Sequence, residues 1–483
     1  MTKKILLDEY AKKSFSRNEA GDGEIYAQQN KRHVLWCADR ETMYTFRGHS
    51  WQEDQTKIAE TLCEAVAIAY EKIMPSIDED EDLWKIYKRR INRLRSVAGR
   101  KNTIEMGKTA RDSKSGELLM TVTSDVFDSD TTKIACPTGI IHLKNGQLRD
   151  GKPEDYTTLA IPTPFHDIDE PCPAWEHCME QIFPDSEVRN YYQKVVGSAF
   201  LGQRLEHYAY VLLGSGRNGK SAMNEELRRV LGSVICTSVP ASLFMEQRFQ
   251  STGPTPELME LSTARFVFVS ELPSKGLLDT PKIKLTTGGD TISARYGYSK
   301  KQSTFQPRCT LFLSCNSVPH CSGDDVTGMN RLRIITFPST VVMDREPNPE
   351  KNEIAYDPNL EKKFAAERSG ILSWIVRGCL LYQLEGLTPP QTVIDHTNEY
   401  KESEDVIGMW LADRQDPARS GWTAAAMLFD DFTTWCETTK TCRPWGSKTF
   451  YSDLKKRVKY EPQAKFKAYD VVLLPANLSL VTD

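Results

Sequence analysis

The feature that most constrains this chain is an eight-residue loop, GSGRNGKS, at positions 214–221. The apolar run YAYVLL precedes it at 208–213, and the sequence AMNEELRRVLG, which has the pattern of a helix, follows. A strand, a GxxxxGK[ST] loop and a helix together form a unit whose backbone N–H groups and helix dipole surround phosphate groups. The sequence therefore predicts an α/β layer with a buried strand that ends at this loop.

The residue types within the loop suit a nucleoside triphosphate. Glycines let the backbone approach and wrap a phosphate. Lys220 can place a point charge on the β- and γ-phosphates, and the Ser221 hydroxyl can bind Mg²⁺. A simple tight turn would not explain Lys-Ser after the last glycine. We therefore predict that ATP and Mg²⁺ bind here through the loop residues Gly214, Gly216, Asn218, Gly219, Lys220 and Ser221.

Polar residues follow two further apolar runs. RFVFV at 265–269 leads into Glu271, and CTLFLS at 309–314 leads into Asn316. A carboxylate in this place can bind the metal and orient the attacking water, and an amide can orient water at the γ-phosphate. The alternatives are a carboxylate that caps a strand and an ordinary turn residue. We predict that Lys220, Glu271 and Asn316 act in catalysis and that Glu271 also contacts the metal.

Two arginines, Arg331 and Arg333, stand at the start of the apolar run RIITF at 333–337. An arginine that one subunit supplies to the phosphates of its neighbour raises the hydrolysis rate by about 10³–10⁵. Without the other motifs, surface arginines beside a strand would be the simpler interpretation. We predict Arg331 as this catalytic arginine, with Arg333 as the alternate.

The four motifs, in this order, resemble those of superfamily 3 DNA helicases of the phage and plasmid primase-helicase type, a family with poxvirus-like members. The segment KLTTGGDTISAR at 284–295 resembles the family's K-x-L-T-G-G-D-x-I-x-A-R segment, and Asn316 with Pro319 behind it resembles the family's sensor. The resemblance covers roughly residues 60–483. The chain departs from the family in having one arginine after Asn330 where relatives often have two, and only Glu271 where many have paired acids.

The resemblance implies an α/β fold, with an AAA+-like P-loop ATPase core between a mostly helical N-terminal domain and a C-terminal winged-helix-like domain. We expect an oligomerisation domain with mixed helices and hairpins over residues 1–165, followed by the ATPase core with its leading helices over 166–345. A helical connector over 346–415 and the winged-helix-like domain over 416–483 complete the chain. The N-terminal primase domain of many relatives is missing, so a separately encoded primase or polymerase is an expected partner.

Residues 291–306, TISARYGYSKKQSTFQ, alternate like two short strands around a turn. In the family such a hairpin points into the central channel of a ring, where cations contact phosphates and aromatic rings contact bases. An exposed hairpin with solubilising lysines is the alternative. We predict that DNA contacts in this region come from Lys284, Arg295, Tyr298, Lys300 and Lys301.

The basic tail at 445–474 reads as a helix followed by a hairpin, with an apolar strand around 471–474. A winged helix of this kind would bind duplex DNA through phosphates, and we predict contacts from Lys455, Lys456 and Arg457. A small domain that mediates protein contacts is the alternative. The basic run at 85–101 fits a solvated helix, a DNA collar or a docking surface equally well.

Near the N-terminus, short strands are expected at 33–36 and 43–46, and a hairpin at 139–149 with a type I′ turn at Asn145-Gly146. Helical patterns cover 58–74, 166–205 and 358–413.

Composition narrows the class of protein. The net charge of −4 argues against a uniformly basic nucleic-acid coat. No segment approaches the roughly 18 apolar residues of a membrane span, and the N-terminus lacks a signal-peptide pattern. The 12 cysteines contain no CxxC pair, and we expect those in apolar runs, such as Cys236, Cys309, Cys315 and Cys379, to be buried in a reducing compartment.

The motifs thus predict an ATP-driven DNA helicase that forms a ring, and the resemblance implies a hexamer that moves 3′ to 5′ on single-stranded DNA. We expect it to unwind forked DNA during phage, prophage or plasmid replication and to work in the cytoplasm of a bacterial host. An origin-binding initiator or replisome scaffold, with ATP as an assembly switch, is the alternative. A packaging ATPase and a small-molecule kinase fit less well, because no nuclease region and no substrate lid stand out.

Overall fold

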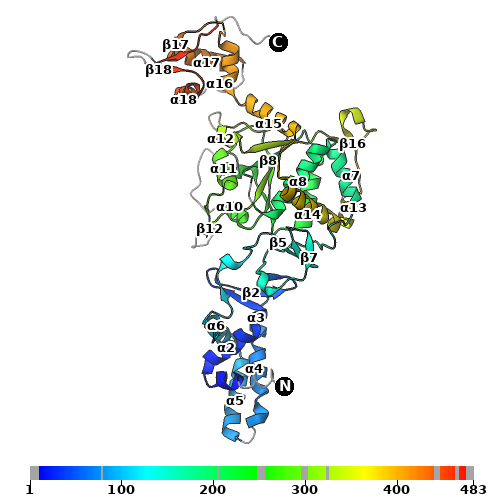
Figure 1. Ribbon diagram of the computed structural model, residues 1–483, viewed down its shortest axis with the longest axis vertical. Coiled ribbons are helices and arrows are strands. Elements are labelled where there is room, and N and C mark those ends of the chain that lie inside the picture. The colour runs from blue at the N-terminus through cyan, green and yellow to red at the C-terminus, as the bar shows by residue number, and fades with distance from the viewer. Residues whose placement is uncertain are drawn as a thin grey trace. The chain divides into compact units, whose positions relative to one another are not determined.

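The computed structural model describes residues 10–77, 80–203, 206–246, 256–294, 303–321, 326–416, 418–439, 446–462 and 467–474. The chain divides into two compact units, whose elements are labelled in Figure 1. The first unit consists of Met1–Pro171, Val230–Ile235 and Arg368–Leu380. The second consists of Cys172–Arg229, Cys236–Glu367 and Leu381–Asp483.

The first unit contains a group of helices, α2 (Asn18–Asn30), α3 (Ile58–Thr61), α4 (Glu64–Glu71), α5 (Glu81–Leu94) and α6 (Val97–Thr109). Helices α2 and α6 lie close together because glycines occupy their contact. A Cβ atom on Gly23 would lie 2.4 Å from the Cβ of Met106, and one on Gly107 would lie 3.0 Å from the Tyr26 ring. Any side chain at Gly23 would therefore push the two helices apart.

The basic run at 85–101 falls on α5 and α6, and much of its charge is paired within the unit. Arg90 Nε donates to the buried carboxylate of Asp22 at 3.0 Å, and Arg95 pairs with Glu64 at 2.7 Å. Lys85, Arg93 and Arg95 also have carboxylate partners in Glu81, Glu19 and Glu71, respectively. The structure therefore favours a role for this run in helix packing.

Two small sheets complete the first unit. Strands β1 (Val34–Cys37), β2 (Thr42–Arg47), β3 (Ser50–Glu53) and β4 (Thr121–Val122) form a sheet in the order β3-β2-β1-β4. Strands β5 (Lys133–Cys136), β6 (Gly139–His142) and β7 (Gln147–Arg149) form an antiparallel sheet.

The pairing of β6 with β7 confirms the predicted hairpin, but the prediction of a type I′ turn at Asn145-Gly146 is wrong. His142 pairs with Gln147, so four residues connect the strands. A type I′ turn needs positive φ at both central residues, and of Asn145 and Gly146 only Gly146 has it, at +70°. The Asn145 side chain instead accepts a hydrogen bond from the Gln147 N–H at 3.1 Å.

A five-stranded parallel sheet forms the centre of the second unit, in the order β14-β8-β13-β10-β9. Its strands are β8 (Ala209–Leu213), β9 (Cys236–Val239), β10 (Phe266–Leu272), β13 (Thr310–Cys315) and β14 (Leu332–Thr336). Four of them confirm the predicted strands, whereas the sequence analysis missed β9, whose central residues are the polar pair Thr237 and Ser238. The fold class is thus mixed α/β with a parallel sheet and helical regions.

The helices of the second unit include α7 (Pro173–Ile182), α8 (Ser186–Leu201), α9 (Lys220–Leu231), α11 (Thr280–Gly288), α13 (Leu360–Ala366) and α15 (Gln391–Ser403). The last residues of α9 belong to the first unit, as do residues 368–380 of α14 (Arg368–Glu385). Apolar side chains from neighbouring strands, among them Val211, Val267 and Leu311, are fully buried. The predicted burial of Cys236, Cys309, Cys315 and Cys379 is confirmed.

The predicted hairpin at 291–306 is present as β11 (Ile292–Ala294) and β12 (Ser303–Phe305), which pair in antiparallel fashion with Ile292 opposite Phe305. The tip lies outside the described residues, and with it four predicted DNA contacts, Arg295, Tyr298, Lys300 and Lys301.

The C-terminal part contains α16 (Val406–Arg414), α17 (Ala425–Thr439) and α18 (Ser447–Arg457) around a core of Trp410, Phe432 and Phe450. Strands β17 (Trp422–Ala424), β18 (Tyr460–Pro462) and β19 (Lys467–Asp470) form an antiparallel sheet in the order β17-β19-β18. The predicted helix and hairpin are confirmed. The strand expected at 471–474 is wrong, because β19 ends at Asp470 and a single bridge at Leu473 follows it.

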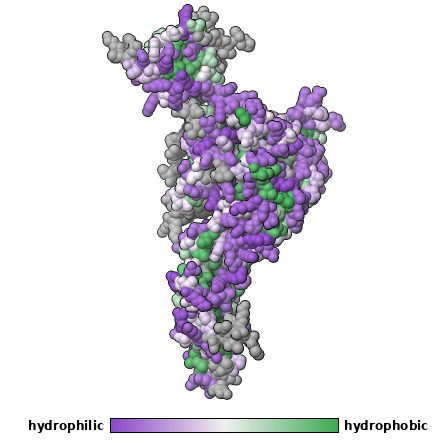
Figure 2. Space-filling view, in the orientation of Figure 1, coloured by the Kyte–Doolittle hydropathy of each residue, from purple (hydrophilic) through white to green (hydrophobic). Residues whose placement is uncertain are grey.

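None of the helices in the described ranges has both the length and the apolar character of a membrane-spanning segment. The face in Figure 2 is largely hydrophilic, with apolar side chains in smaller areas between the polar ones.

Candidate functional site

The glycine-rich loop, Gly214–Lys220, joins the end of β8 to the first turn of α9. Its start is fixed by the neighbouring strands. The Gly214 N–H donates to the Cys315 carbonyl on β13 at 3.2 Å, and the Phe337 N–H donates to the Leu213 carbonyl at 2.7 Å. Because the strands are parallel, the carboxyl ends of β8, β10 and β13 meet at the same edge of the sheet, which is where ligands bind in open α/β sheets.

The backbone of this loop is left-handed at three of four consecutive positions. The φ angles are +92° at Gly216, +48° at Arg217 and +83° at Gly219. Such turns direct successive N–H groups toward one point and create an anion-binding concavity. At Gly219 a Cβ atom would also lie 2.6 Å from the Ile182 side chain on α7, so glycine is required there for two reasons.

Lys220 begins α9, and its ammonium group is buried against main-chain carbonyls. Nζ donates to Gly214 O at 2.7 Å and to Cys315 O at 2.8 Å, and the residue is only 7% exposed. Burial lowers the pKa of Lys220, while the Cys315 and Glu271 side chains act in the opposite direction. A buried ammonium held by carbonyls alone is a costly arrangement that an anionic ligand would relieve.

Glu271 and Asn316 lie at the carboxyl ends of the neighbouring strands β10 and β13. The register of these strands shifts between Val269 and Leu272, which places Glu271 in a bulge. The Asn316 side-chain amide donates to Glu271 Oε1. Two residues that are 45 positions apart in the chain thus form one polar pair beside the glycine-rich loop.

A cavity of about 920 Å³ lies in front of these groups. Lys220, Ser221, Glu271 and Asn316 all line it, so four predicted site residues face one space. Mg²⁺ is commonly held by one or two protein oxygens together with substrate phosphates, and the Ser221 hydroxyl and Glu271 carboxylate fit that pattern.

Two asparagines near the loop contain buried polar atoms without a partner in the described part of the chain, namely Asn218 Nδ2 and Asn224 Oδ1. Asn218 was predicted, and its amide packs so closely over Gly214 that a Cβ there would lie 2.0 Å from Nδ2. Asn224, one helical turn after Lys220, also lines the cavity but was missed. Its four-residue spacing from Lys220 on a helix could have indicated it.

The structure does not bring Arg331 and Arg333 to this cavity. The Arg331 carbonyl accepts from the Ala209 N–H at the amino end of β8, so Arg331 lies about 15 Å along the strand from the glycine-rich loop. Arg331 Nη1 reaches only the His207 carbonyl, at 3.4 Å. The Arg333 guanidinium stacks on the Tyr208 ring at 3.7 Å. Neither arginine can touch a nucleotide bound by its own loop.

Among the predicted DNA contacts, Lys284 is half-buried on α11. Lys455 lies over the Tyr460 ring at 4.3 Å and is exposed. Lys456 pairs with the buried carboxylate of Asp453 at 3.3 Å, and Arg457 pairs with Asp453 at 3.0 Å and with Asp405 at 2.6 Å. Two of the three predicted cations of α18 are therefore engaged within the chain.

Comparison with known proteins shows which proteins this chain is similar to. A family model described as “D5 N terminal like” matches residues 4–184. A protein of Acanthamoeba polyphaga mimivirus named “Putative helicase” is 30% identical over 309 residues, which cover 61% of this chain and 32% of the relative. A “Putative helicase” of Frog virus 3 is 23% identical over 368 residues, covering 61% and 37%.

The chain spans about a third of the length of these curated relatives. Among solved structures, the apo C-terminal region of NrS-1 covers 94% of this chain and 99% of its own length at 10% identity and a TM-score of 0.47, values that transfer neither a fold nor a function. The chain is thus similar to viral proteins named as helicases, and its N-terminal part matches the “D5 N terminal like” family model.

Proposed function

We propose that this chain is an ATP-hydrolysing DNA helicase of superfamily 3 that acts in replication. The observation that carries the proposal is the position of Lys220, buried against two carbonyls at a left-handed loop, with Glu271 and Asn316 facing the same cavity. The names of the viral relatives agree with this class of enzyme.

In the proposed site the N–H groups of the glycine-rich loop bind the phosphates, and Lys220 exchanges its carbonyl partners for phosphate oxygens. Bound Mg²⁺, held by Ser221 and Glu271, would neutralise charge on the phosphates. Glu271 orients the attacking water, and the hydrogen bond from Asn316 fixes the Glu271 carboxylate. Positioning and charge stabilisation of this kind account for most of the catalysis of phosphoryl transfer.

The proposal includes a ring, most simply a hexamer, because an arginine about 15 Å from its own loop can serve only a neighbouring subunit. Movement 3′ to 5′ on single-stranded DNA, an AAA+-like P-loop core and a winged-helix role for the C-terminal part belong to the same proposal. The relatives come from viruses, and a replication role in a virus, phage or plasmid follows from the proposal.

The test combines Glu271→Gln with a matched control, Glu437→Gln, an exposed glutamate on α17. Glu271→Gln should bind ATP but lose ATP hydrolysis by about 10²–10³-fold, because the water is no longer oriented. Unwinding of a fluorescently labelled forked duplex should be lost with it. The control should retain both activities. Hydrolysis by Glu271→Gln at the rate of the control would contradict the proposal.

The alternative, an initiator or scaffold that uses ATP as a switch, predicts a different result in the same assay. The wild-type chain would then bind and hydrolyse ATP and assemble on DNA, but a forked duplex with either polarity of single-stranded tail would stay annealed.

A further inference from the structure

The phosphate-binding groups occupy only part of the 920 Å³ cavity. The rest of its lining includes α7 and the segment 341–363, and neither element contains a predicted site residue. This segment includes the parallel strands β15 (Thr340–Val342) and β16 (Glu353–Ala355). Phosphate binding at the glycine-rich loop does not account for the role of these two parts of the cavity.

The second wall exposes large apolar side chains toward the opening. Met343 is 54% exposed and Tyr356 is 51% exposed, and both line the cavity. Ligand pockets are lined mainly by hydrophobic and aromatic side chains with a few polar groups. Cys178 and Ile182 of α7 line the same cavity. The two walls form a slot with apolar faces.

The slot is fixed to the glycine-rich loop. The Val341 N–H donates to the Arg217 carbonyl at 2.6 Å, and the Tyr356 N–H donates to the Val342 carbonyl at 3.0 Å. The Ser339 hydroxyl donates to the Gln181 carbonyl at 2.6 Å, which attaches the same segment to α7. A group bound in the slot would therefore lie at a set distance from phosphates bound by the loop.

The α7 wall is also held in place at its start. Glu367 accepts from the Ala174 N–H at 2.9 Å and from the Trp175 N–H at 3.1 Å, and the Trp175 ring meets the Phe364 ring edge-on at 5.3 Å. Both walls are thus formed before any ligand binds, which lowers the entropy cost of binding.

The slot also contains a polar side chain that can recognise a base. Gln181 lines the cavity and is half-buried, and its side-chain amide has no hydrogen-bond partner within the described ranges. A glutamine amide can donate and accept at once, which matches the N6 and N7 edge of adenine, whereas guanine presents two acceptors on that edge.

We propose that this slot is the nucleobase subsite of the nucleotide site, in which Tyr356 and Met343 stack on the base and Gln181 selects adenine over guanine. The inference rests on the proposed function, since it requires that a nucleoside triphosphate binds at the glycine-rich loop. It assigns to Gln181, Met343 and Tyr356 a specificity role that no motif in the sequence indicates.

The experiment measures steady-state hydrolysis of ATP and GTP by the full chain and by Tyr356→Ala, Gln181→Ala and the control Leu384→Ala. Leu384 is 81% exposed on α14 and does not line the cavity. Loss of a stacking ring should raise the KM for ATP by about 10-fold or more and change kcat far less. Gln181→Ala should reduce the preference for ATP over GTP by about 10-fold. Leu384→Ala should match the wild type.

Inorganic tripolyphosphate serves as a ligand without a base. Its inhibition constant should be the same for wild type, Tyr356→Ala and Gln181→Ala, because the phosphate-binding groups are intact. If ATP binds and Lys220→Ala abolishes binding, but the KM and the ATP-to-GTP ratio do not change in the slot variants, the base subsite is overturned and the nucleotide site stands. If neither ATP nor tripolyphosphate binds the wild type, the proposed function itself fails.

Discussion

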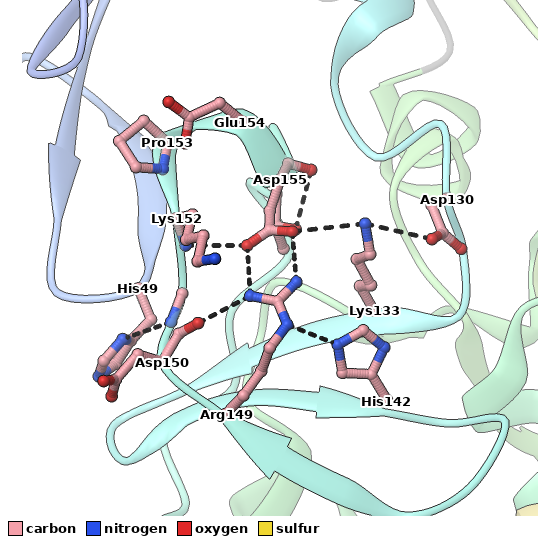
Figure 3. A network of polar contacts seen from close by, with 12 residues as sticks. His49, Asp130, Lys133, His142, Arg149, Asp150, Lys152, Pro153, Glu154 and Asp155 are labelled. Carbon is pink, nitrogen blue, oxygen red and sulfur yellow. Dashed lines mark hydrogen bonds and ion pairs between the residues drawn. The ribbon is translucent and has the colours of Figure 1, made fainter.

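Two charged clusters in this chain differ in how their charges are balanced. The first, in the first unit, is centred on Arg149 and Asp155 (Figure 3). The second is the glycine-rich loop with Lys220. In Figure 3, Lys133 of β5 and Arg149 of β7 point toward the carboxylate of Asp155, which lies in the turn η3 (Pro153–Asp155). Arg149 donates to both Asp155 oxygens, at 2.8 and 2.5 Å, and the Lys152 N–H donates at 2.8 Å.

The same cluster continues to further partners. Lys133 bridges Asp155 and Asp130 at 3.4 and 3.3 Å, and Arg149 Nε donates to His142 at 2.8 Å. Burial and the charge of Arg149 lower the pKa of His142, which favours the neutral ring that can accept this hydrogen bond. Lys133 and Arg149 thus both have acceptors within the chain.

Lys220 is the opposite case, because its buried ammonium has two carbonyl acceptors and, among the described residues, no carboxylate hydrogen-bonded to it. Under the proposed function, the charges that hold the fold together are neutralised internally, whereas the charge of Lys220 is left for the ligand to neutralise. The first cluster should therefore govern stability and the second should govern activity, and the predictions below test that separation.

The largest effect is expected at Arg331, whose guanidinium has only a distant carbonyl contact within the described ranges. Arg331→Ala should reduce ATP hydrolysis by about 10³-fold if the arginine completes a neighbour's site. Rings mixed from Arg331→Ala and Lys220→Ala chains should regain activity, because some interfaces then combine an intact Arg331 with an intact Lys220. Lack of recovery in mixed rings verified by mass would rule out this arrangement.

Lys220→Ala should lower ATP hydrolysis by about 10²–10³-fold, because the positive charge on the phosphates is lost. The free energy of unfolding should change by less than about 1 kcal/mol, since the substitution removes a buried charge that has no carboxylate partner. Urea unfolding followed by circular dichroism measures the second quantity. A large loss of stability would mean that Lys220 is structural, like Arg149.

Asp155→Asn should show the reverse pattern. Removing the carboxylate leaves Arg149 and Lys133 without their shared partner, and breaking a mostly buried ion pair costs about 3 kcal/mol. Nucleotide hydrolysis at temperatures where the chain stays folded should be retained. Arg345, an exposed partner of Glu353, offers a control, because Arg345→Ala removes a surface ion pair of about 0–1 kcal/mol.

The stability conferred by Asp155 should depend on pH. Burial would raise its pKa, but the hydrogen bonds from Arg149 and from the Lys152 N–H lower it from 3.8 to about 2. A carboxyl group with a lowered pKa stabilises the fold above pH 3.8, and this contribution is lost as the pH falls toward 2. Wild type and Asp155→Asn should therefore converge in unfolding free energy by about 2 kcal/mol over that range, with other carboxyl groups cancelling in the difference. A constant difference would contradict the role of this carboxylate.

The smallest effect is expected on the salt dependence of DNA binding, when cations of α18 with and without a carboxylate partner are substituted. Lys455→Ala should reduce the salt dependence of DNA binding by about one phosphate contact. Arg457→Ala should change that slope less, because Asp453 and Asp405 already neutralise the guanidinium, and should lower thermal stability instead. Fluorescence anisotropy on labelled DNA over a salt series measures the slopes. Equal slopes for both variants would show that pairing does not predict DNA contact.

Local sequence determined the elements around the glycine-rich loop. Four sheet strands, the loop and the start of α9 follow from apolar runs interrupted by glycine and lysine, because a buried parallel strand and a phosphate loop each need particular residue types in a row. The hairpin of β11 and β12 and the helix-hairpin order of the tail followed from the same kind of pattern.

Only the tertiary structure decided which distant residues meet. Asn316 reaches Glu271 because β13 pairs with β10 in a register that no local pattern encodes. The pairing of Lys456 and Arg457 with Asp453 and Asp405, and the slot formed by α7 and residues 341–363, likewise depend on packing between segments far apart in the chain. Residue type and spacing fix what one segment can become, whereas the energy of a contact between two segments exists only once both are folded against each other.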